Sequence, residues 1–139
     1  LTPGVYSVIV WARSAGSTAS LEAGTGWEPY RLAAPLSSPA TGVTLNPPSP
    51  LGPQAPGTLV TWTASASGGL APYEYRFWML NQSTGVVTMM QDYTVPGNSW
   101  AWDTTGLTPG VYSVIVWARS AGSTNDFEAG TGWVNYVLQ

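Results

Sequence analysis

The sequence predicts an all-β protein, namely a seven-stranded antiparallel β-sandwich repeated in tandem with a period of about 106 residues. Three observations lead to this fold class. The chain repeats a long segment of itself. It contains short runs rich in Val, Thr, Tyr and Trp, bounded by Gly, Pro, Asn and Ser. No stretch keeps the helical spacing of apolar residues, and 44% hydrophobic residues are enough for a packed core.

The repeat can be read directly in the sequence. Residues 1–32 align with residues 107–138, and 26 of the 32 aligned positions are identical. Leu1–Thr18 matches Leu107–Thr124 without a change, and the letters EAGTGW recur in both copies. Solenoid repeats have periods of about 20–50 residues, and one such repeat cannot fold alone. A period near 106 is instead the size of a whole β-sandwich, so each repeat is expected to have its own core.

The repeat divides the chain into three expected parts. Residues 41–139 form one complete sandwich, and residues 33–40 form a short linker stiffened by Pro35 and Pro39. Residues 1–32 supply the C-terminal two strands, the sixth and the seventh, of a preceding and incomplete repeat. We therefore expect the chain to be a window on a longer, nearly periodic array.

The partial repeat is expected to need partner strands, because an isolated pair of strands is marginally stable in water. Its core face would expose Tyr6, Val8 and Val10. Each chain has two copies of the sixth and seventh strands but one copy of the first five. Exchange between identical chains therefore cannot complete every copy, and the expected partners are neighbouring copies of the repeat.

The first four strands of the complete repeat follow from local patterns. TGVTLNPPSP at 41–50 is a short strand ended by prolines, which suits a sheet edge. GTLVTWTASASGG at 57–69 and PYEYRFWML at 72–80 alternate in polarity, and GVVTMMQDYTV at 85–95 follows a Ser-Thr-Gly turn. The residues predicted to share the inward faces of the second and third strands are Val60, Trp62, Ala64, Ala66, Tyr73, Tyr75, Phe77 and Met79.

The last three strands complete the sandwich. NSWAWDTT at 98–105 is the fifth strand, and GVYSVIVWAR at 110–119 is the sixth and has the strongest strand pattern. FEAGTGWVNYVLQ at 127–139 is the seventh, with a bulge expected at Gly130 or Gly132. The residues predicted to face the core from the sixth strand are Tyr112, Val114, Val116 and Ala118.

Differences between the two copies add information on the seventh strand. Glu28 aligns with Val134, and Arg31 aligns with Val137. A position that accepts both a charge and a valine is expected to be exposed. The residues that are the same in both copies, and are expected to face inward, are Tyr30 with Tyr136 and Leu32 with Leu138.

Two motifs resemble a known family. LTPGVYSVIV at 107–116 resembles the L-x-P-G-x-Y-x-V-x-V signature of fibronectin type III domains, in which the tyrosine forms a corner at the sixth strand. Trp62 in VTWTA resembles their core tryptophan. The whole repeat is similar to the tandem immunoglobulin-like or fibronectin-like repeats of large bacterial surface and secreted proteins. The resemblance implies an extracellular or cell-surface location and a role as a spacer, stalk, adhesive or fibre segment.

Composition disfavours several function classes. The chain has no His and no Cys, and its seven carboxylates are scattered without a calcium-binding spacing. We therefore expect no enzyme, no metal and no cofactor, and a pair of glycosidase carboxylates is the one catalytic alternative. Four arginines, no lysine and a net charge of −3 favour neither nucleic acid nor a membrane surface. No apolar run approaches the ~18 residues that span a bilayer.

The eight tryptophans are the departure from an ordinary spacer domain. Trp78 and Trp117 are predicted on the faces opposite the core, beside Arg76 and Arg119. Three interpretations remain open: Arg–Trp stacks across strands that shield one sheet, contacts between domains or chains, and a platform on which a sugar stacks. The candidate interface or ligand-stacking residues are Trp78, Trp100, Trp102, Trp117, Arg76, Arg119, Trp11 and Arg13.

The leading hypothesis is a structural repeat of a bacterial extracellular fibre, stalk or surface protein. Its partners would be copies of the same repeat, in cis or also in trans, packed head to tail. Low charge and exposed aromatic residues favour such lateral packing. The alternatives are a carbohydrate-binding or adhesive module that uses exposed tryptophans, and an inert spacer in a large secreted protein.

Overall fold

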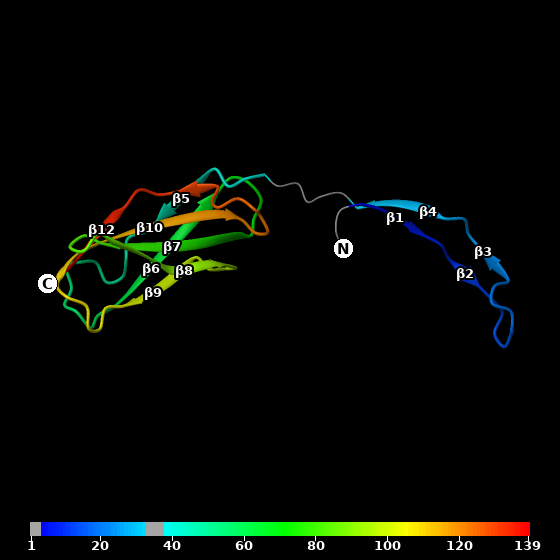
Figure 1. Ribbon diagram of the computed structural model, residues 1–139, viewed down its shortest axis with the longest axis horizontal. Helices are drawn as coiled ribbons and strands as arrows, with labels where there is room; N and C mark the ends of the chain where they lie inside the picture. The colour runs from blue at the N-terminus through cyan, green and yellow to red at the C-terminus, as the bar shows by residue number, and fades with distance from the viewer. Residues whose placement is uncertain (1–3, 33–37) are drawn as a thin grey trace. The chain divides into compact units, whose positions relative to one another are not determined.

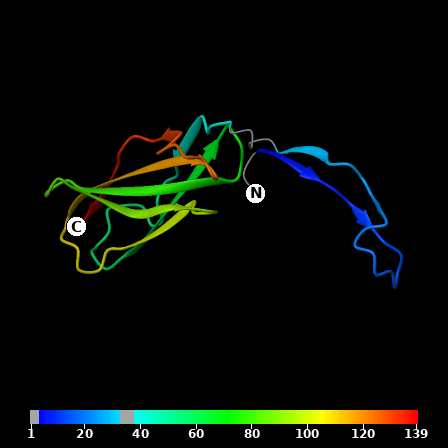
Figure 2. The same cartoon turned by 45° about the vertical axis from the view of Figure 1, so that its right-hand side comes forward.

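A computed structural model describes residues 4–32 and 38–139. The chain is all-β and built from antiparallel sheets, with 53% of its residues in strands and no helix among the described residues. It divides into two compact units, Leu1–Leu36 and Ser37–Gln139 (Figures 1 and 2). We call them unit 1 and unit 2 and describe each by itself. Residues 33–37 of the expected linker lie outside the described residues.

Unit 2 has strands in each of the seven predicted runs. The seventh run is interrupted at 131–133, where a bulge was expected, so it contributes two short strands. The strands are β5 (Gly42–Leu45), β6 (Leu59–Ser67), β7 (Tyr73–Asn81), β8 (Val86–Thr94), β9 (Ser99–Asp103), β10 (Gly110–Ser120), β11 (Ala129–Gly130) and β12 (Val134–Leu138).

These strands form two antiparallel sheets. The smaller sheet has the order β5-β6-β9. In the larger sheet β7 pairs with β8 on one side and with β10 on the other, and both β11 and β12 pair with β10. Figure 1 shows β7 and β10 running along the length of the unit, with β6 crossing them obliquely. A parallel bridge from Gln54 to Leu138 adds a link between the segment after β5 and the end of β12.

One hydrophobic core takes side chains from both sheets. The ring of Trp102 on β9 lies 5.2 Å from Tyr112 on β10 and 5.6 Å from Tyr136 on β12, edge-on in both cases. Such aromatic pairs stabilise a core beyond the area that they bury. The predicted inward faces are confirmed for the residues that are buried, which include Val60, Trp62, Ala64, Tyr75, Phe77, Met79, Val114, Val116, Ala118 and Leu138.

The buried tyrosines have hydrogen-bond partners, as buried hydroxyl groups require. Tyr112 donates its hydroxyl proton to the carbonyl oxygen of Thr108, 2.9 Å away. Tyr136 donates to the carbonyl of Pro50 at 3.1 Å, which ties β12 to the segment between β5 and β6. The positions predicted to be exposed on β12, Val134 and Val137, are exposed.

The segment before β5 is held against one end of unit 2. The Ala40 N–H donates to a carboxylate oxygen of Glu128 at 2.7 Å, and the same oxygen accepts the N–H of Ser120 at 2.8 Å. The carbonyl of Ser38 accepts the Ser120 hydroxyl at 3.0 Å. Residues 38–40 of the expected linker are therefore packed onto unit 2, and Ala40 is buried.

Unit 1 repeats the strand pairing of β10, β11 and β12. Its strands are β1 (Gly4–Val8), β2 (Trp11–Ala12), β3 (Ala23–Gly24) and β4 (Glu28–Leu32). Tyr6 pairs with Tyr30 as Tyr112 pairs with Tyr136, and every other pair in β1–β4 and β2–β3 has its counterpart 106 positions later. The same letters therefore adopt the same register in both units.

Gly97 provides a first stability prediction. It has φ +50°, and an added Cβ would lie 2.2 Å from the carbonyl oxygen of Thr94, which is part of the backbone and cannot rotate away. Gly85 also has a positive φ, +70°, but an added Cβ would meet no atom within 4 Å. We expect Gly85→Ala to cost about 1 kcal/mol and Gly97→Ala about 2 kcal/mol. Urea unfolding of the two variants measures both costs, and equal losses would contradict the clash.

Candidate functional site

The structure places Trp100 and Trp102 in the core, which corrects their prediction as surface residues. They are 8% and 2% exposed, and their rings stack on each other at 6.1 Å. The reason is the register of β9 on β6, in which Trp100 lies opposite Trp62 and Trp102 opposite Val60. Paired residues on neighbouring strands project from the same side of a sheet, so Trp100 and Trp102 face the core together with Trp62 and Val60. The polar neighbours Ser99 and Asp103 on the other face of β9 are the sequence signal that was missed.

Trp78 and Trp117 lie on the outer face of the larger sheet, as predicted, and are half-buried. Their ring centroids are 5.5 Å apart and their planes are inclined by 59°. Trp117 also stacks on Phe127 at 4.9 Å with an interplanar angle of 25°. The two tryptophans therefore do not form the coplanar pair that a sugar platform would need, because their planes are steeply inclined to each other.

The two arginines of this face share an aromatic partner that sequence reasoning missed. The guanidinium of Arg76 lies 4.3 Å from the ring centroid of Tyr93, and that of Arg119 lies 4.0 Å from it. Arg76 is also 5.8 Å from the ring of Trp78. The expected Arg–Trp stack is thus present for Arg76, whereas Arg119 lies over Tyr93. We call these five residues, Arg76, Trp78, Tyr93, Trp117 and Arg119, the outer-face cluster.

Carboxylates neutralise both arginines. Arg76 lies 2.6 Å from Asp92, and Arg119 lies 2.7 Å from Glu74 on the neighbouring strand β7. The pKa of Asp92 is held below its ordinary value, first by the N–H of Tyr93 and then by hydrogen bonding to Arg76. The cluster thus presents two ion pairs around an aromatic ring, not an uncompensated positive patch.

Tyr93 was missed because β8 is irregular. The register between β7 and β8 shifts twice, between Tyr75 and Phe77 and between Phe77 and Trp78. These shifts interrupt the simple alternation from which inward and outward residues are read. The hydroxyl of Tyr93 also donates to the carbonyl of Asp126, which fixes the turn that carries Phe127. No local pattern in the sequence signals a contact between segments that are more than 30 residues apart.

Removing the Tyr93 ring tests the cluster. We expect Tyr93→Leu to lower the stability of unit 2 by about 1–2 kcal/mol, because two guanidinium groups lose their aromatic face. Tyr93→Phe keeps the ring and removes only the hydroxyl bond to Asp126, so it should cost less. Urea unfolding followed by circular dichroism measures both. A Phe variant as unstable as the Leu variant would show that the ring contacts contribute nothing.

Trp11 and Arg13 are the counterparts of Trp117 and Arg119 in unit 1. Trp11 is 61% exposed. Arg13 donates to the carbonyl of Ala19 at 3.4 Å, as Arg119 donates to the carbonyl of Asn125 at 2.9 Å. Unit 1 therefore reproduces the local turn contacts of unit 2.

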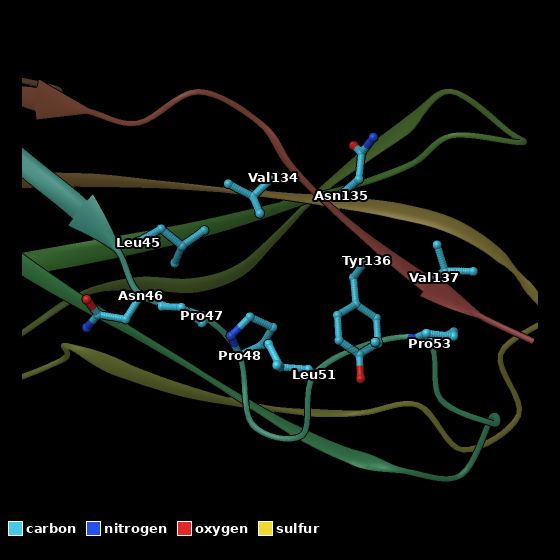
Figure 3. A pocket seen from close by; sticks show the side chains of 11 residues that line it. Leu45, Asn46, Pro47, Pro48, Leu51, Pro53, Val134, Asn135, Tyr136 and Val137 are labelled. Carbon is cyan, nitrogen blue, oxygen red and sulfur yellow. The ribbon is translucent and has the colours of Figure 1, made fainter.

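A groove of about 430 Å³ lies beside β12. Figure 3 shows Pro47, Pro48 and Leu51 from the segment after β5 on one side of it and the side chains of β12 on the other. The ring of Tyr136 points into the space between them. Burial raises the pKa of the Tyr136 hydroxyl. The lining is mainly apolar, with Asn46 and Asn135 as its two amide side chains, and it carries no carboxylate or cation, so its chemistry suits a mainly apolar segment and not a metal or an anion.

The described residues contain no group of three or more His, Cys, Asp or Glu side chains that could hold a metal. Across residues 4–32 and 38–139, no helix is long and apolar enough to cross a membrane. Comparison with known proteins finds no family model, no curated protein and no solved structure that matches this chain. The candidate interaction surfaces are the outer-face cluster and the exposed face of unit 1. Since no relative indicates what they bind, the argument for their roles rests on their geometry.

Proposed function

We propose that the chain is a structural repeat of a large bacterial extracellular fibre, stalk or surface protein, in which sandwich units follow one another head to tail. The observation that carries the proposal is the placement of the two ends of unit 2. The segment at Ser38 lies beside Ser120, at one end of β10, whereas Leu138 pairs with Gly110 at the other end (Figure 1). At about 3.3 Å per residue the two ends of β10 are roughly 33 Å apart.

This placement favours an extended array. A domain whose two ends lie close together adds little to the end-to-end distance of an array. Unit 2 has its ends at opposite ends of β10, so each copy adds its full length to that distance. The sequence repeat supplies the second support, because a neighbouring copy would follow at a fixed spacing. Low charge, with 8% charged residues, favours packing of such units against one another.

Two features support the resemblance to fibronectin type III domains. The first, second and fifth strands form one sheet, and the fourth strand pairs with the third. In constant-type immunoglobulin domains the fourth strand instead belongs to the sheet of the first, second and fifth. The hydroxyl of Tyr112 also bonds to Thr108 a few residues upstream, as in a tyrosine corner.

Scattering from tandem copies tests the head-to-tail array. Chains of two, three and four copies of residues 33–138, joined as Leu32 joins Ala33, would be measured by small-angle X-ray scattering. Unit 2 has its own core, so each copy should fold. We expect the maximum dimension to grow by at least about 33 Å per added copy. A much smaller increment would contradict the array.

Location and ligand are tested separately. Antibodies raised against the full chain should label intact cells that make the protein. Labelling only after permeabilisation would contradict the extracellular proposal. Binding of the full chain to a glycan array, lost in Trp117→Ala with the fold intact, would instead favour the carbohydrate-binding alternative.

A further inference from the structure

The strand β8 forms one edge of the larger sheet. In the parts of the chain that the structure describes, β8 pairs with β7 on one side and with no strand on the other. Its first four residues, Val86–Met89, are all exposed, with Val86 at 56%, Val87 at 51% and Met89 at 44%. The edge of a sheet presents N–H and C=O groups that can pair with a further strand. The start of β8 is therefore a template for such pairing.

The other edges of unit 2 carry features by which proteins block pairing with a further strand. β5 is four residues long and is followed closely by Pro47 and Pro48. β9 is five residues long and ends at Asp103, and β11 has two residues. β12 is bonded to the segment after β5, where the N–H of Gln54 donates to the carbonyl of Val137 at 3.2 Å. β8 has nine residues, and its start has none of these features.

The start of β8 also carries no charge. The letters VVTMMQ at 86–91 include no charged residue, no Pro and no Gly. Asp92 follows them and is paired with Arg76. Short neutral segments with high β-propensity are the ones that pair with copies of themselves, whereas a Lys or Pro on an edge opposes pairing. The composition of this edge thus favours the addition of a strand.

A second copy of β8 fits this edge because the strand is complementary to itself. Two copies related by a two-fold axis through Thr88 would pair antiparallel, with Val87 opposite Met89 and Val86 opposite Met90. Residues that lie opposite each other then project from the same side of the joined sheet. Thr88 would lie opposite its own copy, and Thr–Thr pairs stabilise antiparallel sheets.

Charge favours this register over the neighbouring one. With the axis at Thr88, Asp92 of each copy lies opposite Thr84 in the turn of the other copy. With the axis at Met89, Asp92 would lie opposite Val86 and would have to bring its carboxylate against an apolar side chain. The axis at Thr88 therefore pairs neutral residues alone.

The joined sheet would also continue the apolar outer face of unit 2. Val87 lies opposite Leu80 on β7, and Met89 lies opposite Trp78 of the outer-face cluster. In the paired copies, Val87 and Met89 of one chain would contact Met89 and Val87 of the other. Apolar side chains that are exposed in the single chain would thus be removed from water, which favours association.

We infer that the start of β8 is a docking edge for a second copy of this chain, in which Val86–Met90 of the two copies pair antiparallel about Thr88. This is a small interface beside the roughly 800 Å² per partner of a standard one, so single chains associate weakly. In the array proposed above the edge would recur in each repeat, and several weak contacts between two arrays would reinforce one another. That reinforcement rests on the proposed array, whereas the pairing of single chains does not.

A single cysteine tests the register, because the chain has no cysteine of its own. In the paired copies the two Cα atoms of residue 88 would be about 4.5–5.5 Å apart, a separation that a disulfide bridges. Thr94→Cys is the matched control, since it makes the same change at an exposed position of β8 whose copies would lie roughly 40 Å apart. In a glutathione redox buffer, we expect Thr88→Cys to form disulfide-linked dimers at least about tenfold faster than Thr94→Cys. Non-reducing gels measure both rates.

Two charge variants of the Thr88→Cys chain test the contacts beside the axis. Val87→Lys/Met89→Lys places like charges opposite each other in both Val–Met pairs, whereas Val87→Lys/Met89→Glu places opposite charges there. Both positions are exposed, so both variants should fold, which circular dichroism checks. We expect the variant with two lysines to form dimers at least about tenfold more slowly than the variant with Lys and Glu.

Two outcomes would overturn the inference. In the first, Thr88→Cys forms dimers no faster than Thr94→Cys, as expected if this edge is open to a strand of a different protein. In the second, the two charge variants form dimers at equal rates, so that Val87 does not meet Met89 of the other copy. Neither outcome affects the head-to-tail array, which the scattering and labelling experiments test.

Discussion

Tyr136→Ala is expected to destabilise unit 2 by about 3–5 kcal/mol, the usual cost of removing a buried aromatic ring. The ring of Tyr136 packs edge-on against Trp62 at 5.9 Å and against Trp102 at 5.6 Å. Its removal leaves a cavity between the two sheets and breaks the hydroxyl bond to Pro50. Urea unfolding followed by tryptophan fluorescence measures the loss.

The repeat supplies the control for this prediction. Tyr30→Ala changes the same residue in the same register, but in unit 1, where its side chain is exposed, so the unfolding of unit 2 should not change. Tyr136→Phe removes only the hydroxyl and should cost about 1 kcal/mol. A Tyr136→Ala variant no less stable than Tyr30→Ala would contradict the placement of this ring in the core.

Glu128→Gln is expected to cost unit 2 about 2 kcal/mol at neutral pH. The carboxylate accepts the N–H groups of Ala40 and Ser120, and hydrogen bonds to a charged group contribute more than neutral ones. Burial acts to raise the pKa of Glu128, but hydrogen bonds from Ser123, Ser120 and Ala40 outweigh it. The pKa of the folded state is thus below the ordinary value of 4.5.

The sign of the pH dependence follows from that lowered pKa. The contribution of the charged carboxylate is fully present above about pH 4.5 and is lost as the pH falls through the lower pKa of the folded state. The difference in stability between wild type and Glu128→Gln should therefore shrink in acid. Denaturant unfolding of both proteins from about pH 7 to about pH 3 measures it. A difference that stays constant over this range would contradict the ionised Glu128.

Glu22→Gln is the control for the carboxylate. Glu22 accepts the N–H of Ser14, the counterpart of Ser120, but lies in unit 1. Its substitution should leave the unfolding of unit 2 unchanged at every pH. A loss in unit 2 would mean that the two units are energetically coupled.

Alternation predicted the faces of the regular strands well. In β6 and β10 every second residue is apolar and the others are polar or half-exposed, and burial follows this pattern from Val60 to Ala64 and from Val114 to Ala118. A period of two is a local property of the backbone, so one strand is enough to read it. The positions of all seven strand runs were predictable for the same reason.

The candidate site was less predictable, because it depends on which strands become neighbours. Trp100 and Trp102 share a face in any register, but only their pairing with β6 turns that face inward. Tyr93 joins Arg76 and Arg119 across two register shifts and a contact with a distant turn. Sequence patterns give the face of a strand, whereas a site between strands needs the register of the sheet.

The placement of the two ends of unit 2 has a mechanical consequence. A force that pulls these ends apart acts along β12, from Leu138 outward, and along β5, from Gly42 in the opposite direction. The ladder bonds between antiparallel strands lie perpendicular to that force. The five residue pairs of β10 and β12 are thus loaded together in shear and cannot open one after another like a zipper. Tension along the direction in which the chain runs therefore acts on all five of these residue pairs at once.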